Sequence, residues 1–133
     1  MLARLQQAIT VSLILLAACW AVWFGHQGRW GWAMAGALAI LFGYALFLGL
    51  EFLMLAFTRG DDPAPRATPV QMLQAWWGEV LSAPRVFCWR QPFHADAEPD
   101  WLQPAHAGRL GVLFVHGFVC NRGFWNPWLR RLR

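Results

Sequence analysis

The residues with the clearest chemical signature lie near the end of the chain, where His116, Gly117 and Phe118 follow the apolar run Leu110–Val115. An apolar run of this length predicts a central β-strand that is buried on both faces. Apolar residues with helical spacing come next, at Trp125, Trp128, Leu129 and Leu132. Backbone N–H groups on a sharp turn between a strand and a helix can stabilise negative charge on a carbonyl oxygen. The pattern therefore favours ester hydrolysis, which builds up such a charge.

The segment from Val112 to Leu132 resembles the oxyanion-hole region of α/β-hydrolases, especially bacterial esterases and lipases. In that family the strand before the first major helix ends in His-Gly, and the next residue donates its backbone N–H to the oxyanion. The resemblance implies that Phe118 is this donor, that Gly117 allows the turn and that His116 braces the loop. It also implies an ester or lipid substrate and no cofactor or metal.

The nucleophile of this family is a serine in a G-x-S-x-G elbow, followed by an acid and a histidine. The two serines of the chain are Ser12, inside an apolar segment, and Ser82, in Leu-Ser-Ala-Pro, and neither forms an elbow. The chain stops at Arg133, within the predicted helix. We therefore expect an N-terminal fragment of a membrane-anchored serine hydrolase, truncated before the nucleophile. Only the full-length parent is expected to be an enzyme, with this chain inactive.

Composition argues against several other kinds of site. The eleven basic residues are all arginines and are dispersed, so the formal charge of +4 predicts no nucleic-acid surface. Cys19, Cys88 and Cys120 form no CxxC pair or metal-ligand cluster. The alternating acids of the loop 94–107 lack the glycine and glutamate that complete a calcium loop. No metal site is expected.

Two apolar segments near the N-terminus are long enough to span a bilayer. The chain is 58% hydrophobic and 14% charged, against about 25% charged in ordinary soluble domains. Spans are expected at about residues 5–25 and 31–52, separated by a polar turn at 26–29. Glu51 then lies at the membrane interface, or else it is an intramembrane functional group. The lipid bilayer is thus an expected partner.

Small residues recur every four positions in the second segment, at Ala35, Ala39 and Gly43. This spacing lets two helices approach closely. We expect the first span to be the partner in an antiparallel hairpin, with homodimerisation or another membrane helix as alternatives.

The first segment has a second interpretation. Arg4 followed by an apolar stretch resembles a signal peptide, and Leu16-Ala17-Ala18-Cys19 fits a bacterial lipobox with a lipidated cysteine. The chain stays apolar beyond Cys19, which favours an anchored helix. The expected location is the bacterial inner membrane. Positive charge predicts that both termini are cytoplasmic, because the N-terminal amine, Arg4, Arg59 and Arg66 flank one side of the spans and Arg29 the other.

The remaining chain predicts a linker and a domain start. Residues 59–67 lack an apolar period and indicate a linker. Thr68, Pro69 and Gln71 are typical of a helix N-terminus with a capping box. Trp76 and Trp77 in this helix are expected to pack against a sheet or, alternatively, to insert into the membrane surface. The apolar run 86–89 predicts an early β-strand.

The expected fold is thus a two-helix transmembrane hairpin at 1–58 followed by an incomplete α/β-hydrolase-like domain at 68–133. The alternative to the hydrolase fragment is a small membrane interaction protein that packs through its hairpin.

Overall fold

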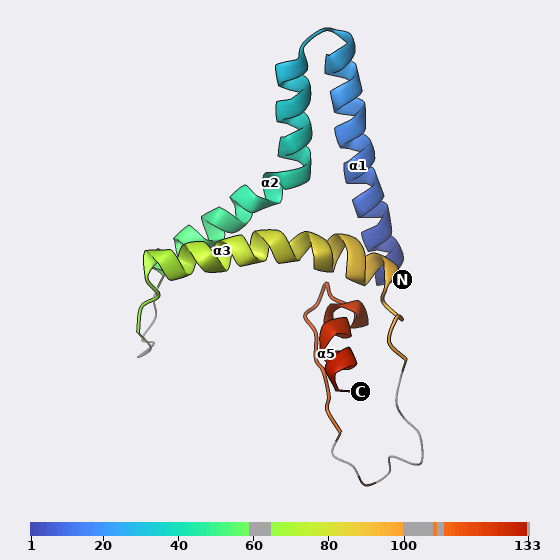
Figure 1. Cartoon of the computed structure of the whole chain (residues 1–133), viewed down its shortest axis with the longest axis vertical. Coiled ribbons are helices and arrows are strands. Elements are labelled where there is room, and N and C mark those ends of the chain that lie inside the picture. Colours follow the sequence, from blue (N-terminus) through green and yellow to red (C-terminus); the bar gives the residue numbers. More distant parts are fainter. Residues whose placement is uncertain (59–64, 100–107, 109–110, 133) are drawn as a thin grey trace. The chain divides into compact units, whose positions relative to one another are not determined.

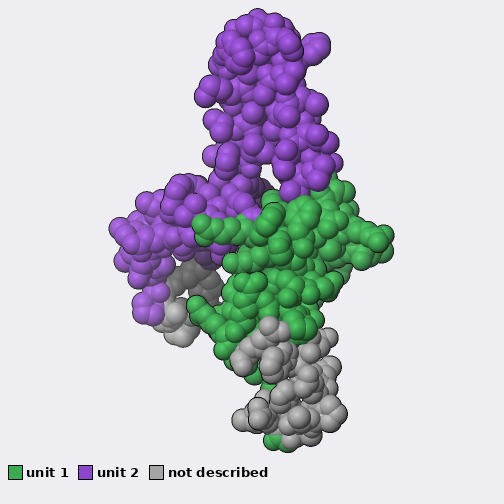
Figure 2. All heavy atoms as spheres, turned by 45° about the vertical axis from the view of Figure 1, so that its right-hand side comes forward, with its two compact units in different colours: residues 1–8, 85–133 green, residues 9–84 purple. Residues whose placement is uncertain are grey.

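A computed structural model describes residues 1–58, 65–99, 108 and 111–132. The chain divides into two compact units, one formed by residues 9–84 and one by residues 1–8 and 85–133 (Figure 2). The described residues fold as helices, turns and irregular segments.

Two long helices, α1 (Leu2–His26) and α2 (Trp30–Phe57), account for both apolar segments. Each is long and apolar enough to cross a membrane. An uninterrupted helix satisfies its own backbone hydrogen bonds, which is what a lipid-spanning segment requires. The observed helices extend a few residues beyond the expected spans 5–25 and 31–52.

The turn between α1 and α2 is a Schellman motif. Gly28 has a φ of 72°, a left-handed conformation that favours glycine. The N–H of Gly28 donates to the Gly25 carbonyl at 2.9 Å, and the N–H of Arg29 donates to the Phe24 carbonyl at 2.9 Å. These two bonds satisfy carbonyls that the end of α1 would otherwise leave free. The Arg29 guanidinium also lies 5.5 Å from the centre of the Phe24 ring.

A tryptophan of α1 fixes its contact with α2. The indole Nε1 of Trp20 donates to the Trp32 carbonyl at 2.9 Å. A Cβ atom placed on Gly36 would lie 1.9 Å from that nitrogen, so only glycine fits there. Ala33, in the same part of α2, is buried.

Helix α3 (Pro69–Ala83) begins as its sequence predicts. The Thr68 side chain accepts from the N–H of Gln71 at 3.3 Å, and the Gln71 side chain accepts from the N–H of Thr68 at 2.8 Å. This capping box, with Pro69 in the first turn, is confirmed.

Helix α3 packs against α2 through two hydrogen bonds to backbone carbonyls. Trp76 Nε1 donates to the Ala45 carbonyl at 3.0 Å, and the Tyr44 hydroxyl donates to the Val80 carbonyl at 2.7 Å. In a regular helix the Val80 carbonyl would accept from the residue four positions later, which is Pro84. Because proline has no N–H, Tyr44 supplies the missing donor.

The predicted strand at Val86–Trp89 is wrong. Residues Pro84–Arg90 form a π-helical turn, η1, which leads into the short helix α4 (Gln91–Phe93). Pro84 has helical φ and ψ angles, and Pro92 lies in the first turn of α4, where a missing N–H costs nothing. The helical path therefore continues through both prolines, although the α-helical part α3 ends at Ala83.

The expected α/β-hydrolase-like domain is also wrong, because no residue that the structure describes is in a β-strand. Residues 111–115 of the predicted central strand are irregular, and Leu110 lies outside the described residues. A buried strand needs neighbouring strands to satisfy its backbone groups, and the described part of the chain supplies none. The resemblance to α/β-hydrolases is therefore not supported by the fold.

The predicted helix near the C-terminus is present as two short elements, η3 (Arg122–Trp125) and α5 (Asn126–Arg131). The Asn121 side chain caps η3 by accepting from the N–H of Gly123 at 2.9 Å. A Cβ on Gly123 would lie 2.6 Å from the Arg90 carbonyl oxygen, so η3 approaches that backbone as closely as glycine permits.

Candidate functional site

The three residues expected to form an oxyanion hole lie in an exposed turn. The N–H of Cys120 donates to the Gly117 carbonyl at 3.1 Å, which closes the turn. The Phe118 side chain is fully exposed, and His116 Nδ1 lies 3.0 Å from the Gly117 carbonyl oxygen. Their catalytic role stays a prediction. That role and the ester hydrolase activity were inferred from a resemblance to α/β-hydrolases, and the described residues do not form the fold of that family.

The other residues that could do chemistry do not converge. The Ser82 hydroxyl donates to the Glu79 carbonyl within its own helix at 3.3 Å. Cys19, Cys88 and Cys120 are free thiols. Among the described residues no group of three His, Cys, Asp or Glu side chains is placed to hold a metal ion.

The acidic loop, whose alternating carboxylates are reminiscent of a calcium site, contributes a buried glutamate to an ion pair with the exposed Arg130. Glu98 is buried, and its Oε1 lies 2.5 Å from Nε of Arg130 in α5. His94, at the start of this loop, accepts through its carbonyl from Asn126 Nδ2 at 2.8 Å. These contacts attach the loop to α5, so they give Glu98 a structural role. Asp100 lies outside the described residues.

A cluster of three amide side chains forms the buried centre of the unit that contains residues 1–8 and 85–133. Gln91 is fully buried, and its Oε1 accepts from Gln6 Nε2 at 3.2 Å and from the N–H of Asn121 at 2.7 Å. Asn121 Nδ2 donates to Gln6 Oε1 at 3.0 Å and to the Gln91 carbonyl at 2.8 Å. The three residues thus join the start of α1, α4 and the residue before η3.

This amide cluster binds backbone as well as side chains. Gln6 Nε2 also donates to the Val119 carbonyl at 3.1 Å, and Gln7 Nε2 donates to the Pro92 carbonyl at 2.7 Å. Amides neither ionise nor act as nucleophiles, so the cluster stabilises the fold and performs no acid–base step. No motif in the sequence predicted this cluster. The only local signal is the pair Gln6-Gln7 just before an apolar run.

The small-residue stripe Ala35, Ala39 and Gly43 is open. Both alanines are exposed, and a Cβ on Gly43 would meet nothing within 4 Å. Helix α1 contacts α2 at Gly36, beside the buried Ala33. Gly36 lies on the same side of α2 as Gly43, seven positions later, but the contact leaves the three stripe positions uncovered. The expectation that α1 covers the stripe therefore does not hold, and the stripe is available to another helix.

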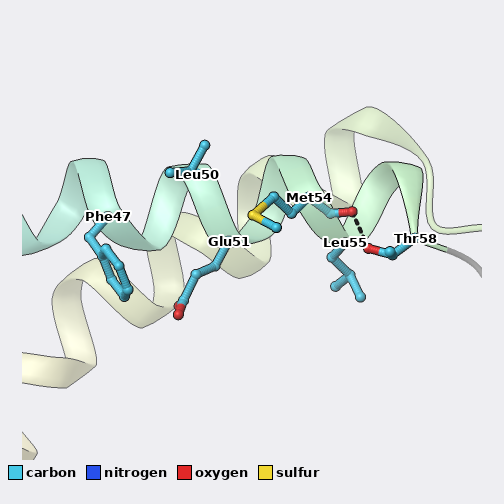
Figure 3. A pocket seen from close by; sticks show the side chains of 6 residues that line it. All are labelled: Phe47, Leu50, Glu51, Met54, Leu55 and Thr58. Carbon is cyan, nitrogen blue, oxygen red and sulfur yellow. Dashed lines mark hydrogen bonds between the residues drawn. The ribbon is translucent and has the colours of Figure 1, made fainter.

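Glu51 lies on an apolar face in the second half of α2. It lines a shallow, open pocket with four neighbours on the same helix and the residue that follows that helix; they are Phe47, Leu50, Met54, Leu55 and Thr58 (Figure 3). The Thr58 hydroxyl donates back to the Met54 carbonyl. A single carboxylate with no cationic partner among the described residues gives this pocket no chemistry of its own.

Comparisons with protein-family models, with curated proteins and with solved structures find no match for this chain. The two apolar helices and their exposed surfaces are therefore the features of the described residues that bear on function.

Proposed function

We propose that this chain is an integral membrane protein whose α1–α2 hairpin binds a helix of another membrane protein. The observation that carries the proposal is the exposure of large apolar side chains along both helices, such as Trp23 at 67% and Leu46 at 79%. In water each buried Leu or Met side chain would gain about 1.5–3 kcal/mol, so such helices need a non-aqueous surrounding. A bilayer supplies it.

The stripe Ala35, Ala39 and Gly43 is the surface proposed for the partner helix. Association between helices in lipid depends on close backbone approach and on packing, because the lipid is as apolar as the side chains. The exposed alanines and the open space at Gly43 permit such an approach. The hairpin's own contact, at Gly36, leaves all three stripe positions uncovered, so a partner helix can approach them.

The proposed location is the bacterial inner membrane, with both termini cytoplasmic and the Schellman turn on the other side. Single cysteines at Gln27 and at Ala67 test this arrangement. A membrane-impermeant maleimide added to intact spheroplasts should label the Gln27→Cys variant at once, and the Ala67→Cys variant only after permeabilisation. Labelling of both without permeabilisation, or release of the protein by alkaline carbonate, would contradict the proposal.

The Gly43→Ile variant tests the partner surface. A photoreactive amino acid at Ala39 should cross-link the wild-type chain to a membrane protein, and Gly43→Ile should abolish that product, because its side chain fills the space that the partner backbone needs. The matched control is Leu38→Trp, which adds bulk at an exposed position off the stripe. Equal cross-linking in all three chains would reject the stripe as the interface, and a product of twice the chain mass would identify a second copy as the partner.

A further inference from the structure

Helix α3 carries an apolar stripe that nothing in its own unit covers. Its members follow one another at intervals of three or four residues and are between 47% and 63% exposed; they are Val70, Leu73, Trp77 and Leu81. These intervals place all four side chains on one face of the helix. The stripe is therefore a continuous apolar surface and not a scatter of single residues.

The rest of α3 is divided between a packed face and a polar face. Trp76 and the buried Val80, on the neighbouring face, rest on α2. Gln71 and Glu79 are exposed and lie on the side of α3 away from the stripe. Gln74, four positions after Val70 and three before Trp77, lies beside the stripe instead. The two adjacent tryptophans thus have different roles, since Trp76 fastens α3 to α2 while Trp77 faces outward.

The position of α3 beside α2 relates the stripe to the membrane. Within residues 9–84, α2 bends, and its second half runs beside α3, crosswise to its first half (Figure 1). Helix α2 has 28 residues, about 42 Å at 1.5 Å per residue, whereas the hydrocarbon core is about 30 Å thick. The excess length is accommodated where α2 turns toward α3, so this helix pair belongs at the boundary of the bilayer.

We infer that α3 is an interfacial helix whose stripe of Val70, Leu73, Trp77 and Leu81 inserts into the lipid–water boundary, an inference that rests on the proposed membrane location. The second half of α2 also exposes large apolar side chains, including Phe47 and Leu50. Its one outward tryptophan suits the depth at which indole rings concentrate. Helix α3 contains no basic residue, so insertion depends on apolar burial and not on anionic lipid.

Spin labels on the full chain test this inference. Cys19, Cys88 and Cys120 are replaced by Ala, and single labelled cysteines are placed at Leu73, Trp77 and Leu81 of the stripe, at Gln71 and Glu79 of the polar face, and at Leu38 in the first half of α2. The protein is reconstituted in phosphatidylcholine vesicles. Collision rates are measured with oxygen, which concentrates in lipid, and with a water-soluble nickel chelate.

The expected result is a reversal between the two faces of α3. Labels on the stripe should collide more with oxygen than with the nickel chelate, and labels at Gln71 and Glu79 should show the opposite order. The ratio should be unchanged when phosphatidylglycerol is added. If one stripe variant fails to fold, as judged by its helical circular dichroism, the two other stripe positions decide.

Three other results would overturn the inference and separate its failure from that of the proposed function. Stripe labels open to the nickel chelate, with Leu38 still in lipid, would mean that the protein is membrane-embedded but that α3 lies in water. Stripe labels protected from both reagents would mean that protein covers the stripe. A label at Leu38 that is open to the nickel chelate would reject the membrane location itself.

Discussion

Each half of α2 packs against the indole ring of one tryptophan from a neighbouring helix. Trp20 of α1 lies on Gly36 and donates to the Trp32 carbonyl, and Trp76 of α3 lies near Gly49 and donates to the Ala45 carbonyl. In both pairs the indole donates to the carbonyl of the residue four positions before the glycine. In a regular helix the N–H of the glycine donates to this same carbonyl, so the carbonyl accepts two hydrogen bonds.

The two contacts differ in how much space the glycine must leave. A Cβ on Gly36 would lie 1.9 Å from Trp20 Nε1, whereas a Cβ on Gly49 would lie 3.4 Å from Trp76 Nε1, an ordinary contact. The first contact therefore needs glycine, and the second does not. In lipid, where close packing and hydrogen bonds associate helices, the α1–α2 contact is specified by shape and the α2–α3 contact by its two hydrogen bonds.

The largest expected effect comes from Gly36→Ala. The added methyl group displaces the rigid Trp20 ring, so the hydrogen bond to the Trp32 carbonyl and the close packing are lost together. We expect the free energy of unfolding, measured by titrating the reconstituted protein with a denaturing detergent, to fall by roughly 1–3 kcal/mol.

Two controls isolate this contact. Gly43→Ala adds the same methyl group where nothing lies within 4 Å and should leave the free energy of unfolding nearly unchanged. In a Trp20→Ala background, Gly36→Ala should cost much less than in the wild type, because residues in contact give non-additive effects. Additive losses would show that Trp20 is not what Gly36 accommodates.

A smaller effect is expected from Tyr44→Phe, which removes the donor to the Val80 carbonyl. That carbonyl cannot accept from Pro84, so its desolvation is left uncompensated. A net hydrogen bond contributes about 0.5–1.5 kcal/mol. Amide hydrogen exchange in the second half of α3 should therefore accelerate, by up to about tenfold for the upper value.

Pro84→Ala provides the matched background for this test. An alanine in place of this proline supplies the N–H that a regular helix would give to the Val80 carbonyl, so the effect of Tyr44→Phe should shrink. The same acceleration in both backgrounds would argue that the tyrosine ring, and not its hydroxyl, holds α3 on α2.

Local features of this fold could be predicted from the sequence, since each depends on neighbours in the chain. The capping box at Thr68 needs only Pro69 and Gln71, and the two apolar helices follow from continuous composition. The apolar run 111–115 could not be assigned in this way. A strand and an irregular segment share its local pattern, and the difference lies in partner strands that no local pattern reports.

The helix contacts could not be predicted for a related reason. Small residues occur on more than one face of α2, and the spacing of Ala35, Ala39 and Gly43 gave no sign that Trp20 would select Gly36 instead. The amide cluster could not be predicted either, because Gln6 and Gln91 are 85 positions apart and the sequence around a glutamine does not indicate whether its side chain is buried. Both depend on which surfaces meet after the helices form.

The smallest expected effect, and the sharpest test of the comparison, comes from Gly49→Ala. A Cβ at 3.4 Å from Trp76 Nε1 needs no movement of the ring, so the hydrogen bond to the Ala45 carbonyl should persist. We expect the free energy of unfolding to change by no more than about 0.5 kcal/mol, with amide exchange in α3 as in the wild type. Trp76→Phe, which removes the donor and keeps an aromatic ring, should accelerate that exchange. If Gly49→Ala destabilised the protein as much as Gly36→Ala, both indoles would require glycine, and the distinction between a contact specified by shape and one specified by hydrogen bonds would fail.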